Sequence, residues 1–393
     1  MSKGRQIEIV ILFIVISFAL LYLFCEQTKN QKFPELNIPQ GFTALFNGEN
    51  FSGWQVIPEN TVFSIEDNMI LCSGESGFPN VLLTEKKYEN FILHIDFKIH
   101  PAAKTGNSGI FIHAPAHGRQ SKNGFEIQIL DTFNEPPTKT SAGAIYDLVA
   151  PDTNAIRAVG EWNHYEITMD WPKLQVSLNG AQIQDVDLST EHYMKYRRRI
   201  GYIGLQNHEN PIAFQNIFIK ELPSQVKYET LFNGENTNGW QVQGAAEWQA
   251  EGGCLKVTGG PGWLISEKEY QNFEFLALVR NNPSLTGGVY FRWQNESDPG
   301  YLAEFYNLEN AIQFTNNGKE VPEGALPVFR NYDYLPFQVL AFNRQSEVRI
   351  NGSVAAFNLA HQKIRPGKIA LFIPEGNEVI YFQEILVREL TEW

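Results

Sequence analysis

The chain carries one set of motifs twice, in the same order. The motif Leu-Phe-Asn-Gly-Glu-Asn, followed shortly by Gly-Trp, begins at Leu45 and again at Leu231. Later positions also match, among them Phe91 with Phe273, Asn179 with Asn351, and Phe214 with Phe382. The offset between the copies shrinks gradually along the chain, as expected if loops shortened while strands were kept. The sequence therefore predicts one domain repeated, at residues 42–222 and 228–390, with a short linker between them.

A hydrophobic segment precedes the first copy. Residues 9–25 are apolar except for one serine, and Lys3 and Arg5 stand before them. Their length is close to what a bilayer requires, so residues 1–32 are predicted to be a signal anchor and linker. A lipoprotein signal ending at Cys25 is the alternative, and a buried helix is a third interpretation. Because positive charge precedes the segment, both copies are expected outside the cytoplasm, periplasmic or on the cell surface, and anchored to a membrane.

Composition narrows the classes of partner. The net charge is −13 at pH 7, and the one basic stretch, Arg197–Arg199, is interpreted as a solvated loop. A nucleic-acid partner is not expected, because phosphate binding draws on clustered Lys and Arg. Cys72 and Cys254 do not occupy matching positions in the two copies, so a disulfide framework is not expected either.

The hydrophobic pattern is that of strands. Residues 93–99 and 165–169 alternate apolar with polar side chains, and Asn179-Gly180 is typical of a hairpin turn. Alternation of this kind places one face of a sheet in a core and the other in water. Long helical periodicity is absent from the sequence. The chain is therefore predicted to be all-β, with each copy an antiparallel sandwich of two sheets.

The first copy resembles a known family. Its motifs are similar to those of the 3-keto-disaccharide hydrolase domain, whose fold is a concanavalin-like jelly-roll sandwich. The second copy resembles this family only in its framework. Three positions depart from the family pattern: His113 and Gln215 stand where Arg is usual, and Glu209 where Gly is usual. The matching stretches are Leu45–Gly48 with Gly53-Trp54, Asn107–Phe111, Gly124–Asp131, Gly143–Asp147, Gly160–Asn163, Leu178–Gly180, Leu205–His208 and Phe214–Ile217.

Comparison of the copies shows where polar chemistry is confined to the first. The polar residues Glu126, Asp131, His164 and His208 align with Leu302, Asn307, Pro336 and Pro374, whereas Gln128 aligns with Glu304. A position that becomes Leu no longer needs a charge. The second copy is therefore not expected to catalyse a reaction.

Glu126 and Gln128 are two residues apart on one predicted strand, so they project from the same face, while Ile127 and Ile129 point into the core. The candidate catalytic residues are Glu126, His208 and Asp131, with His164 weaker. The first three also have structural interpretations: Glu126 as a solvated outer-face carboxylate, His208 as a loop-capping imidazole and Asp131 as a turn former. The candidate substrate-binding residues are Asn107, His113, Gln128, Tyr146, Asp147, Asn163 and Gln206.

The resemblance implies a particular reaction. A ketone at C3 of a sugar acidifies the C2 proton; a general base removes it, the C1 substituent leaves, and water addition completes a net hydrolysis. Carboxylates and His could also hold a divalent metal ion, although the sequence has no HxH or HExxH spacing. The alternatives are a lectin-like carbohydrate-binding protein without catalysis and a scaffold of the cell envelope. An oligosaccharide or glycoside is the expected ligand of the first two.

Overall fold

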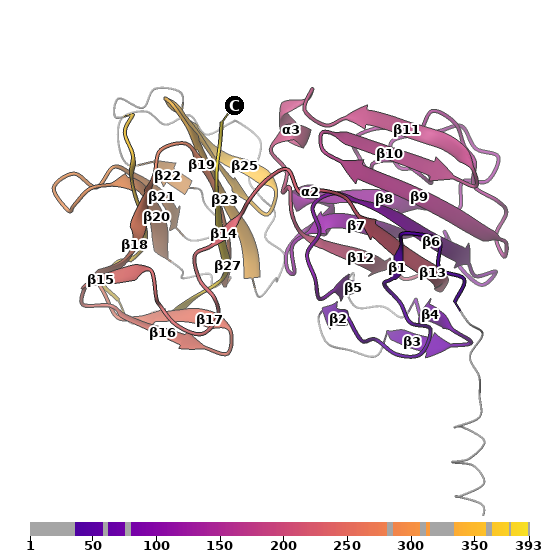
Figure 1. Ribbon diagram of the computed structural model, residues 1–393, viewed down its shortest axis with the longest axis horizontal. Helices are drawn as coiled ribbons and strands as arrows, with labels where there is room; N and C mark the ends of the chain where they lie inside the picture. The colour runs from indigo at the N-terminus through magenta and orange to yellow at the C-terminus, as the bar shows by residue number, and fades with distance from the viewer. Residues whose placement is uncertain are drawn as a thin grey trace, which may run out of the picture.

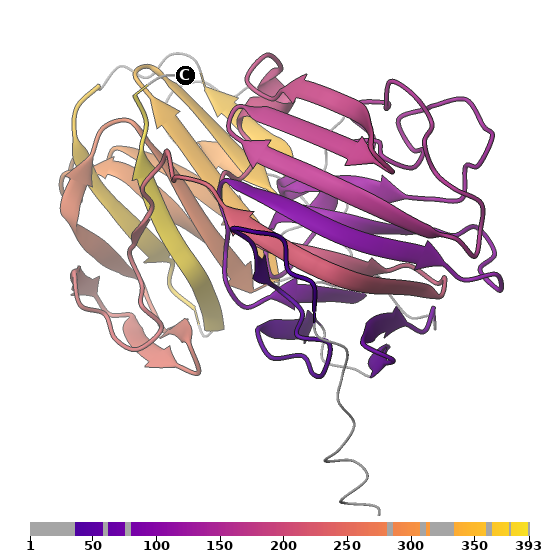
Figure 2. The same cartoon turned by 45° about the vertical axis from the view of Figure 1, so that its right-hand side comes forward.

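The computed structural model describes residues 36–57, 62–74, 80–280, 286–306, 312–314, 334–358, 364–376 and 379–391, and in them the protein is all-β (Figure 1). The predicted anchor, residues 1–32, lies outside these ranges. Within them no helix is long and apolar enough to cross a membrane. Each half of the chain forms two sheets of its own, which Figure 2 shows as two layers in each half.

The first half contains an eight-stranded and a five-stranded sheet. The larger sheet has the order β11 (Ala181–Asp187), β10 (Lys173–Leu178), β9 (Trp162–Asp170), β6 (Phe91–Ile99), β13 (Ile212–Glu221), β4 (Met69–Cys72) and β3 (Phe63–Glu66), with β1 (Thr43–Ala44) paired to β13. The smaller sheet has the order β2 (Trp54–Ile57), β5 (Asn80–Thr84), β12 (Tyr202–Asn207), β7 (Ser108–Ala114) and β8 (Phe125–Ile129). Two short helices, α2 (Gln120–Asn123) and α3 (His192–Lys195), lie in the connections.

The second half repeats this arrangement. Its eight-stranded sheet has the order β16 (Glu247–Glu251), β17 (Cys254–Thr258), β27 (Val379–Glu389), β19 (Phe273–Arg280), β23 (Tyr334–Phe342), β24 (Gln345–Ile350) and β25 (Ser353–Asn358), with β14 (Glu229–Thr230) paired to β27. The other sheet has the order β15 (Trp240–Gly244), β18 (Gly262–Tyr270), β26 (Gly367–Ile373), β20 (Thr286–Trp293), β21 (Tyr301–Tyr306) and β22 (Ile312–Phe314).

Strand alternation builds the core of each half, as the sequence predicted. Along β6 every second side chain, from Phe91 to Ile99, is buried, and the intervening ones are partly exposed. These side chains meet the inward faces of β7, β8 and β12, including the fully buried Ile110 and Ile127. Each large apolar side chain removed from water contributes roughly 1.5–3 kcal/mol. The buried faces of the two sheets therefore hold the sandwich together.

The two halves pack through non-equivalent faces. Leu278 and Tyr334, on the outer face of the second half's eight-stranded sheet, contact Val81, Leu83 and Phe111 on the outer face of the first half's five-stranded sheet. The counterpart of Leu278 in the first half is Asp96. The two residues hold the same place in the pairing of β19 with β23 and of β6 with β9. The second copy thus has an apolar outer face where the first has a polar one. That difference fixes which sheet docks.

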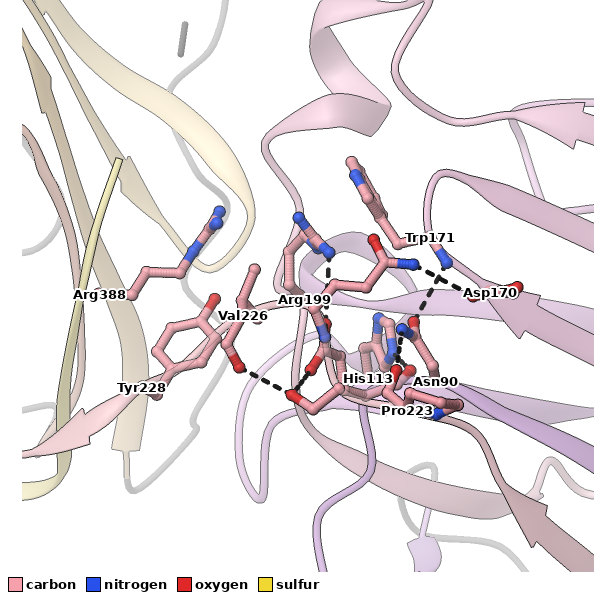
Figure 3. A network of polar contacts seen from close by, with 12 residues as sticks. Asn90, His113, Asp170, Trp171, Arg199, Pro223, Val226, Tyr228 and Arg388 are labelled. Carbon is pink, nitrogen blue, oxygen red and sulfur yellow. Dashed lines mark hydrogen bonds and ion pairs between the residues drawn. The ribbon is translucent and has the colours of Figure 1, made fainter. Parts of the chain in front are cut away.

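The basic stretch Arg197–Arg199 was predicted to be a solvated loop. This prediction is wrong, because all three side chains are buried at this boundary. Arg198 forms an ion pair with Glu384 of the second half, with 3.2 Å between Nη2 and Oε2. Arg199 pairs with Glu89 at 3.3 Å and lies over the ring of Trp171 at 4.2 Å, beside the linker that leads to Tyr228 (Figure 3). Burial is tolerated because these guanidinium groups have partners supplied by distant parts of the chain.

The Asn-Gly hairpin turn has a second role in the second half. Both copies form it, with positive φ at Asn179 and Gly180 and at Asn351 and Gly352. The Oδ1 atom of Asn351 accepts hydrogen bonds from the Arg119 N–H at 2.6 Å and from Asn123 Nδ2 at 3.3 Å, both at helix α2. The turn of the second half therefore docks on the first half, whereas a Cβ added at Gly180 would meet nothing within 4 Å.

Replacement of Gly352 by Ala is expected to loosen this docking. A Cβ there would lie 2.5 Å from the Lys122 carbonyl oxygen, at a φ of +78°. The free energy of unfolding of the variant should fall by ~1–2 kcal/mol from left-handed strain and by about 1–3 kcal/mol more from overpacking. Gly180→Ala is the matched control, since it carries the strain alone. Chemical unfolding of both variants measures the difference; equal destabilisation would show that the turn does not bear on the interface.

Candidate active site

A polar patch lies on the outer face of the first half's five-stranded sheet. On β8, Glu126 and Gln128 pair with Phe111 and Gly109 of β7, while Ile127 faces the core. The sequence predicted this division of the strand between two faces. Glu126 and Gln128 are only 4% and 3% exposed, however, so this part of the face is not open to solvent as a free sheet surface would be.

Glycine in the neighbouring strand makes room for Glu126. A Cβ at Gly109 would overlap Glu126 Oε1, so the carboxyl group occupies the space that a larger side chain on β7 would fill. Gly109 was not among the predicted site residues, although its counterpart Gly288 also faces the aligned strand of the second copy. Burial raises the pKa of Glu126 to about 8. This carboxyl can therefore release and accept a proton near neutral pH.

A row of amides connects Glu126 with His208. With its amide nitrogen toward Glu126, Gln128 donates to Glu126 Oε1 at 3.2 Å and to the Ser108 carbonyl at 3.1 Å, and its oxygen faces the Asn107 amide at 3.2 Å. The Asn107 amide also lies 3.3 Å from His208 Nδ1. His208 itself is exposed. The structure thus brings together a buried carboxyl and an exposed imidazole, linked through two neutral side chains.

Gln206 and Tyr146 flank this row. Leu205 on β12 pairs with Ile110 on β7, which places Gln206 next to Gly109 on the patch face. Gln206 is 8% exposed, and its Oε1 atom has no hydrogen-bond partner within the part of the chain described. The backbone N–H of Tyr146 donates to the Glu126 carbonyl at 2.9 Å, which extends the sheet beyond β8. Both residues were predicted to bind substrate, and both lie beside Glu126.

His113 does not lie in the patch, which corrects its prediction as a substrate-binding residue. It is fully buried, and its ring nitrogens lie 2.6 Å from the Glu89 carbonyl and 3.0 Å from the Arg198 carbonyl, behind the linker (Figure 3). Burial lowers its pKa to about 4. In the second half Arg292 occupies the matching buried position and donates to the Gln271 carbonyl. The position is therefore structural in both copies.

Asn163 is also structural. It lies on β9 in the opposite sheet, is 1% exposed, and accepts hydrogen bonds from the Arg157 N–H at 2.9 Å and from Asn179 Nδ2 at 2.8 Å. These bonds support the Asn-Gly turn. His164 lies on the same sheet, with Nδ1 2.6 Å from Asp96 Oδ1. Its replacement by Pro in the second copy occurs where that sheet packs on the first half, so it reflects docking rather than lost chemistry.

The two aspartates predicted here lie at the margins. Asp131 is exposed beyond the end of β8, where its N–H donates to the Thr105 carbonyl at 3.1 Å. Asp147 is exposed, has a φ of 63°, and donates its N–H to the Lys139 carbonyl at 2.9 Å. The sequence left a divalent metal ion open, and no residues are assigned to one. Among the described residues, no group of three or more His, Cys, Asp or Glu side chains is placed to hold a metal ion.

The second half keeps the geometry of the patch without its chemistry. Leu302 pairs with Tyr290 as Glu126 pairs with Phe111, and a Cβ at Gly288 would meet the Leu302 side chain. Pro374 follows β26 where His208 follows β12. Asn307, the counterpart of Asp131, lies outside the described residues. At the position of Gln128 the second half has a carboxyl, Glu304, and burial raises its pKa.

The raised pKa of Glu126 predicts an effect on stability. Between pH 4.5 and about 8 the folded protein keeps a proton that the unfolded chain releases. The free energy of unfolding should therefore fall as pH rises through this window. Glu126→Gln removes this contribution and should be more stable than the native protein at pH 8, by an amount on the order of a few kcal/mol.

Chemical unfolding at pH 5 and pH 8 measures this difference, with Glu304→Gln as a control at a less buried carboxyl. Parallel pH dependence of the native protein and the Glu126→Gln variant would contradict the assignment of a buried, protonated carboxyl.

Comparisons with known proteins agree with the repeat. The sequence model of the 3-keto-alpha-glucoside-1,2-lyase-like domain matches residues 41–220 and again residues 227–388. A 3-keto-disaccharide hydrolase from Bacteroides thetaiotaomicron is 23% identical over 251 residues, which cover 51% of this chain and 86% of that protein.

Two crystal structures from Parabacteroides distasonis, both of proteins provisionally named glycosyl hydrolases, are also similar. One is 25% identical with a TM-score of 0.41 and covers 47% of this chain and 94% of that one. The other is 26% identical with a TM-score of 0.40 and covers 46% and 99%. Since the family model matches most of the chain in two consecutive stretches, the protein belongs to the 3-keto-alpha-glucoside-1,2-lyase-like domain family and carries the domain twice.

Proposed function

We propose that the first domain cleaves 3-keto-glycosides, including 3-keto-disaccharides, at the patch around Glu126. Two observations support the proposal: the chain belongs to a family named for this chemistry, and a carboxyl with a pKa raised to about 8 lies in the patch. The single observation that carries it is the burial of Glu126. A solvated carboxylate is a weak base, whereas a desolvated one is poised to take a proton from carbon.

The reaction proceeds by elimination and hydration. Glu126, in its ionised form, removes the proton from C2, and the electron pair is delocalised onto the C3 ketone oxygen as an enolate. The side-chain amide of Gln206 donates to that oxygen and stabilises it. The enolate then expels the C1 substituent, which takes a proton from His208, and leaves a double bond between C1 and C2. Water adds at C1 and gives its proton to His208, while Glu126 returns its proton to C2, so the sum is hydrolysis of the C1–O bond.

This chemistry explains why one buried carboxyl is sufficient. Ordinary glycosidases need two carboxyl groups at set separations, one on either side of the bond. Here the ketone already activates the C2 proton, so the site needs a base, a dipole for the enolate and an acid. The second domain, with Leu302 in place of Glu126, takes no part in proton transfer. It covers the neighbouring apolar part of the sheet around Phe111.

We extend the proposal to the fold type and the location of the protein. Both sandwiches are concanavalin-like jelly rolls, and the enzyme acts outside the cytoplasm, held at a membrane by its N-terminal segment. No step is assigned to a metal ion.

Incubation of the full-length protein with the 3-keto and unoxidised forms of one aryl glucoside tests the reaction. We expect release of the aryl alcohol from the 3-keto form alone, with exchange of the C2 proton for deuterium in deuterated water. Release from both forms at equal rates would indicate an ordinary glycosidase. Binding of either form without any release would favour the lectin-like alternative.

A further inference from the structure

A pocket lies beside the patch, between the two domains. It has a volume of about 440 Å³ and is lined by four cationic side chains and one carboxylate. Three of the cations and the carboxylate come from the first domain, and the fourth cation comes from the second. Tyr146, whose N–H is bonded to the Glu126 carbonyl, also lines it. The charged lining residues are Arg119, Lys122, Arg197, Arg349 and Asp147.

Arg349 is buried in this wall with unused hydrogen-bonding capacity. It is 3% exposed, and its Nε atom donates to Glu347 Oε1. Glu347 also meets His192, with 2.6 Å between Oε2 and Nε2. The Nη2 atom of Arg349 is buried and has no hydrogen-bond partner in the portion of the chain that the structure describes. A buried guanidinium N–H without an acceptor lowers the stability of the folded protein. A ligand that accepts a hydrogen bond from Nη2 would remove this cost.

Arg197 faces the same pocket without a carboxylate partner among the described residues. It is 9% exposed, and its Nη1 atom donates to the carbonyls of Ser121 at 2.5 Å and Gly124 at 2.6 Å. Carbonyl groups solvate the guanidinium but do not neutralise its charge. Burial and the nearby Arg349 lower the pKa of Arg197 to about 10, against an opposing effect of Asp147. Burial and the neighbouring Arg119 lower the pKa of Lys122 as well.

The lining of this pocket has more positive than negative side chains, although the chain as a whole has a net charge of −13. The domains also differ at this point: Arg349 on β24 occupies the register position of Ser177 on β10. The second copy thus lacks the carboxyl and imidazole of the patch but has gained a cation that closes a pocket beside them. Guanidinium groups recognise planar carboxylates and sulfate esters through paired hydrogen bonds.

We propose that this pocket binds the anionic group of an acidic sugar, a carboxylate or a sulfate ester, through Arg349 and Arg197. The inference rests on the proposed function, in that it names the substrate class of the adjacent patch as glycosides carrying such a group. The anion satisfies the free N–H of Arg349 and separates two cations that otherwise repel each other. Tyr146 lines the pocket and is bonded through its N–H to the Glu126 carbonyl, so it connects the pocket with β8. The second domain therefore contributes to binding what the first domain cleaves.

Calorimetric titration of the full-length protein with methyl glucuronide, glucose 6-sulfate and methyl glucoside tests the inference. We expect at least one of the two acidic sugars to bind ten-fold or more tightly than the neutral one, and the acidic sugar that does so identifies the anion. Inorganic sulfate provides a further arm. If it binds as tightly as glucose 6-sulfate, the pocket is an ion site only and the assignment to a sugar is wrong.

Two variants assign the effect to the pocket. Arg349→Gln should reduce the preference for the acidic sugar about ten-fold, which is ~1.4 kcal/mol. Lys122→Gln, at the partly exposed rim, should reduce it less and does not remove a buried ion pair. Lys173→Gln, on the exposed strand β10, is the control and should change nothing.

Equal affinities for acidic and neutral sugars, or an unchanged preference in both pocket variants, would overturn the inference. The titration measures binding of unoxidised sugars, without turnover. A failure of the proposed reaction would appear only in the assay with 3-keto substrates, so the two proposals can fail independently.

Discussion

Glu126→Gln is expected to lower turnover of a 3-keto-glycoside by about 10²- to 10⁴-fold, the usual contribution of a general base. The substitution keeps the shape of the side chain over Gly109 but removes its ability to accept a proton. Because the pKa of Glu126 is raised to about 8, kcat/KM for a substrate whose leaving group needs no acid, such as nitrophenolate, should increase as pH rises through that value. Steady-state kinetics between pH 5 and pH 9 measure both effects.

Glu304→Gln is the matched control for this substitution, since Glu304 is a carboxyl on the corresponding face of the second domain. It should leave turnover nearly unchanged. A Glu126→Gln variant that retains native turnover would remove Glu126 from the reaction, and the binding-module interpretation of the first domain would then be the better one.

His208→Ala is expected to lower turnover by a similar factor, about 10²- to 10⁴-fold, because departure of the C1 substituent loses its proton donor. His208 is exposed, and its described side-chain contact is with Asn107, so the fold should be little affected. A leaving group that needs no proton, such as nitrophenolate, should recover much of the lost rate in the variant. This recovery separates the role of an acid from a purely structural role.

His164→Ala is the matched control for the imidazole. It removes a half-exposed His that pairs with Asp96 on the opposite sheet, and turnover should stay close to the native value. Equal losses in both variants, or no recovery with the better leaving group, would show that His208 does not act as the acid.

Some features of the site could be predicted from the sequence because they follow from local periodicity. Glu126 and Gln128 share a face, with Ile127 between them pointing inward, since side chains alternate along any strand. The contrast between Glu126 and Leu302 was also visible, because the two copies serve as an internal alignment. Gly109 could have been found by the same comparison, since Gly288 stands at its place.

Other predictions failed because burial depends on contacts between distant segments. Asn163 is a polar residue in a family motif and His113 follows one closely, and nothing nearby in the sequence distinguishes a buried His bonded to two carbonyls from one in a site. The basic stretch Arg197–Arg199 was interpreted as solvated for the same reason. Its ion partners are Glu89 and Glu384, one from the first copy and one from the second.

The sequence by itself determined that the protein is a tandem repeat of one all-β domain, and which face of β8 carries the polar residues. These properties depend on order and spacing along the chain. The tertiary structure alone decided that Glu126 is desolvated, that the second domain docks on the sheet that carries it, and that Arg197 and Arg349 share one pocket. Desolvation and charge repulsion are set by what surrounds a group in space, and here the surrounding residues are separated by up to hundreds of positions in the chain.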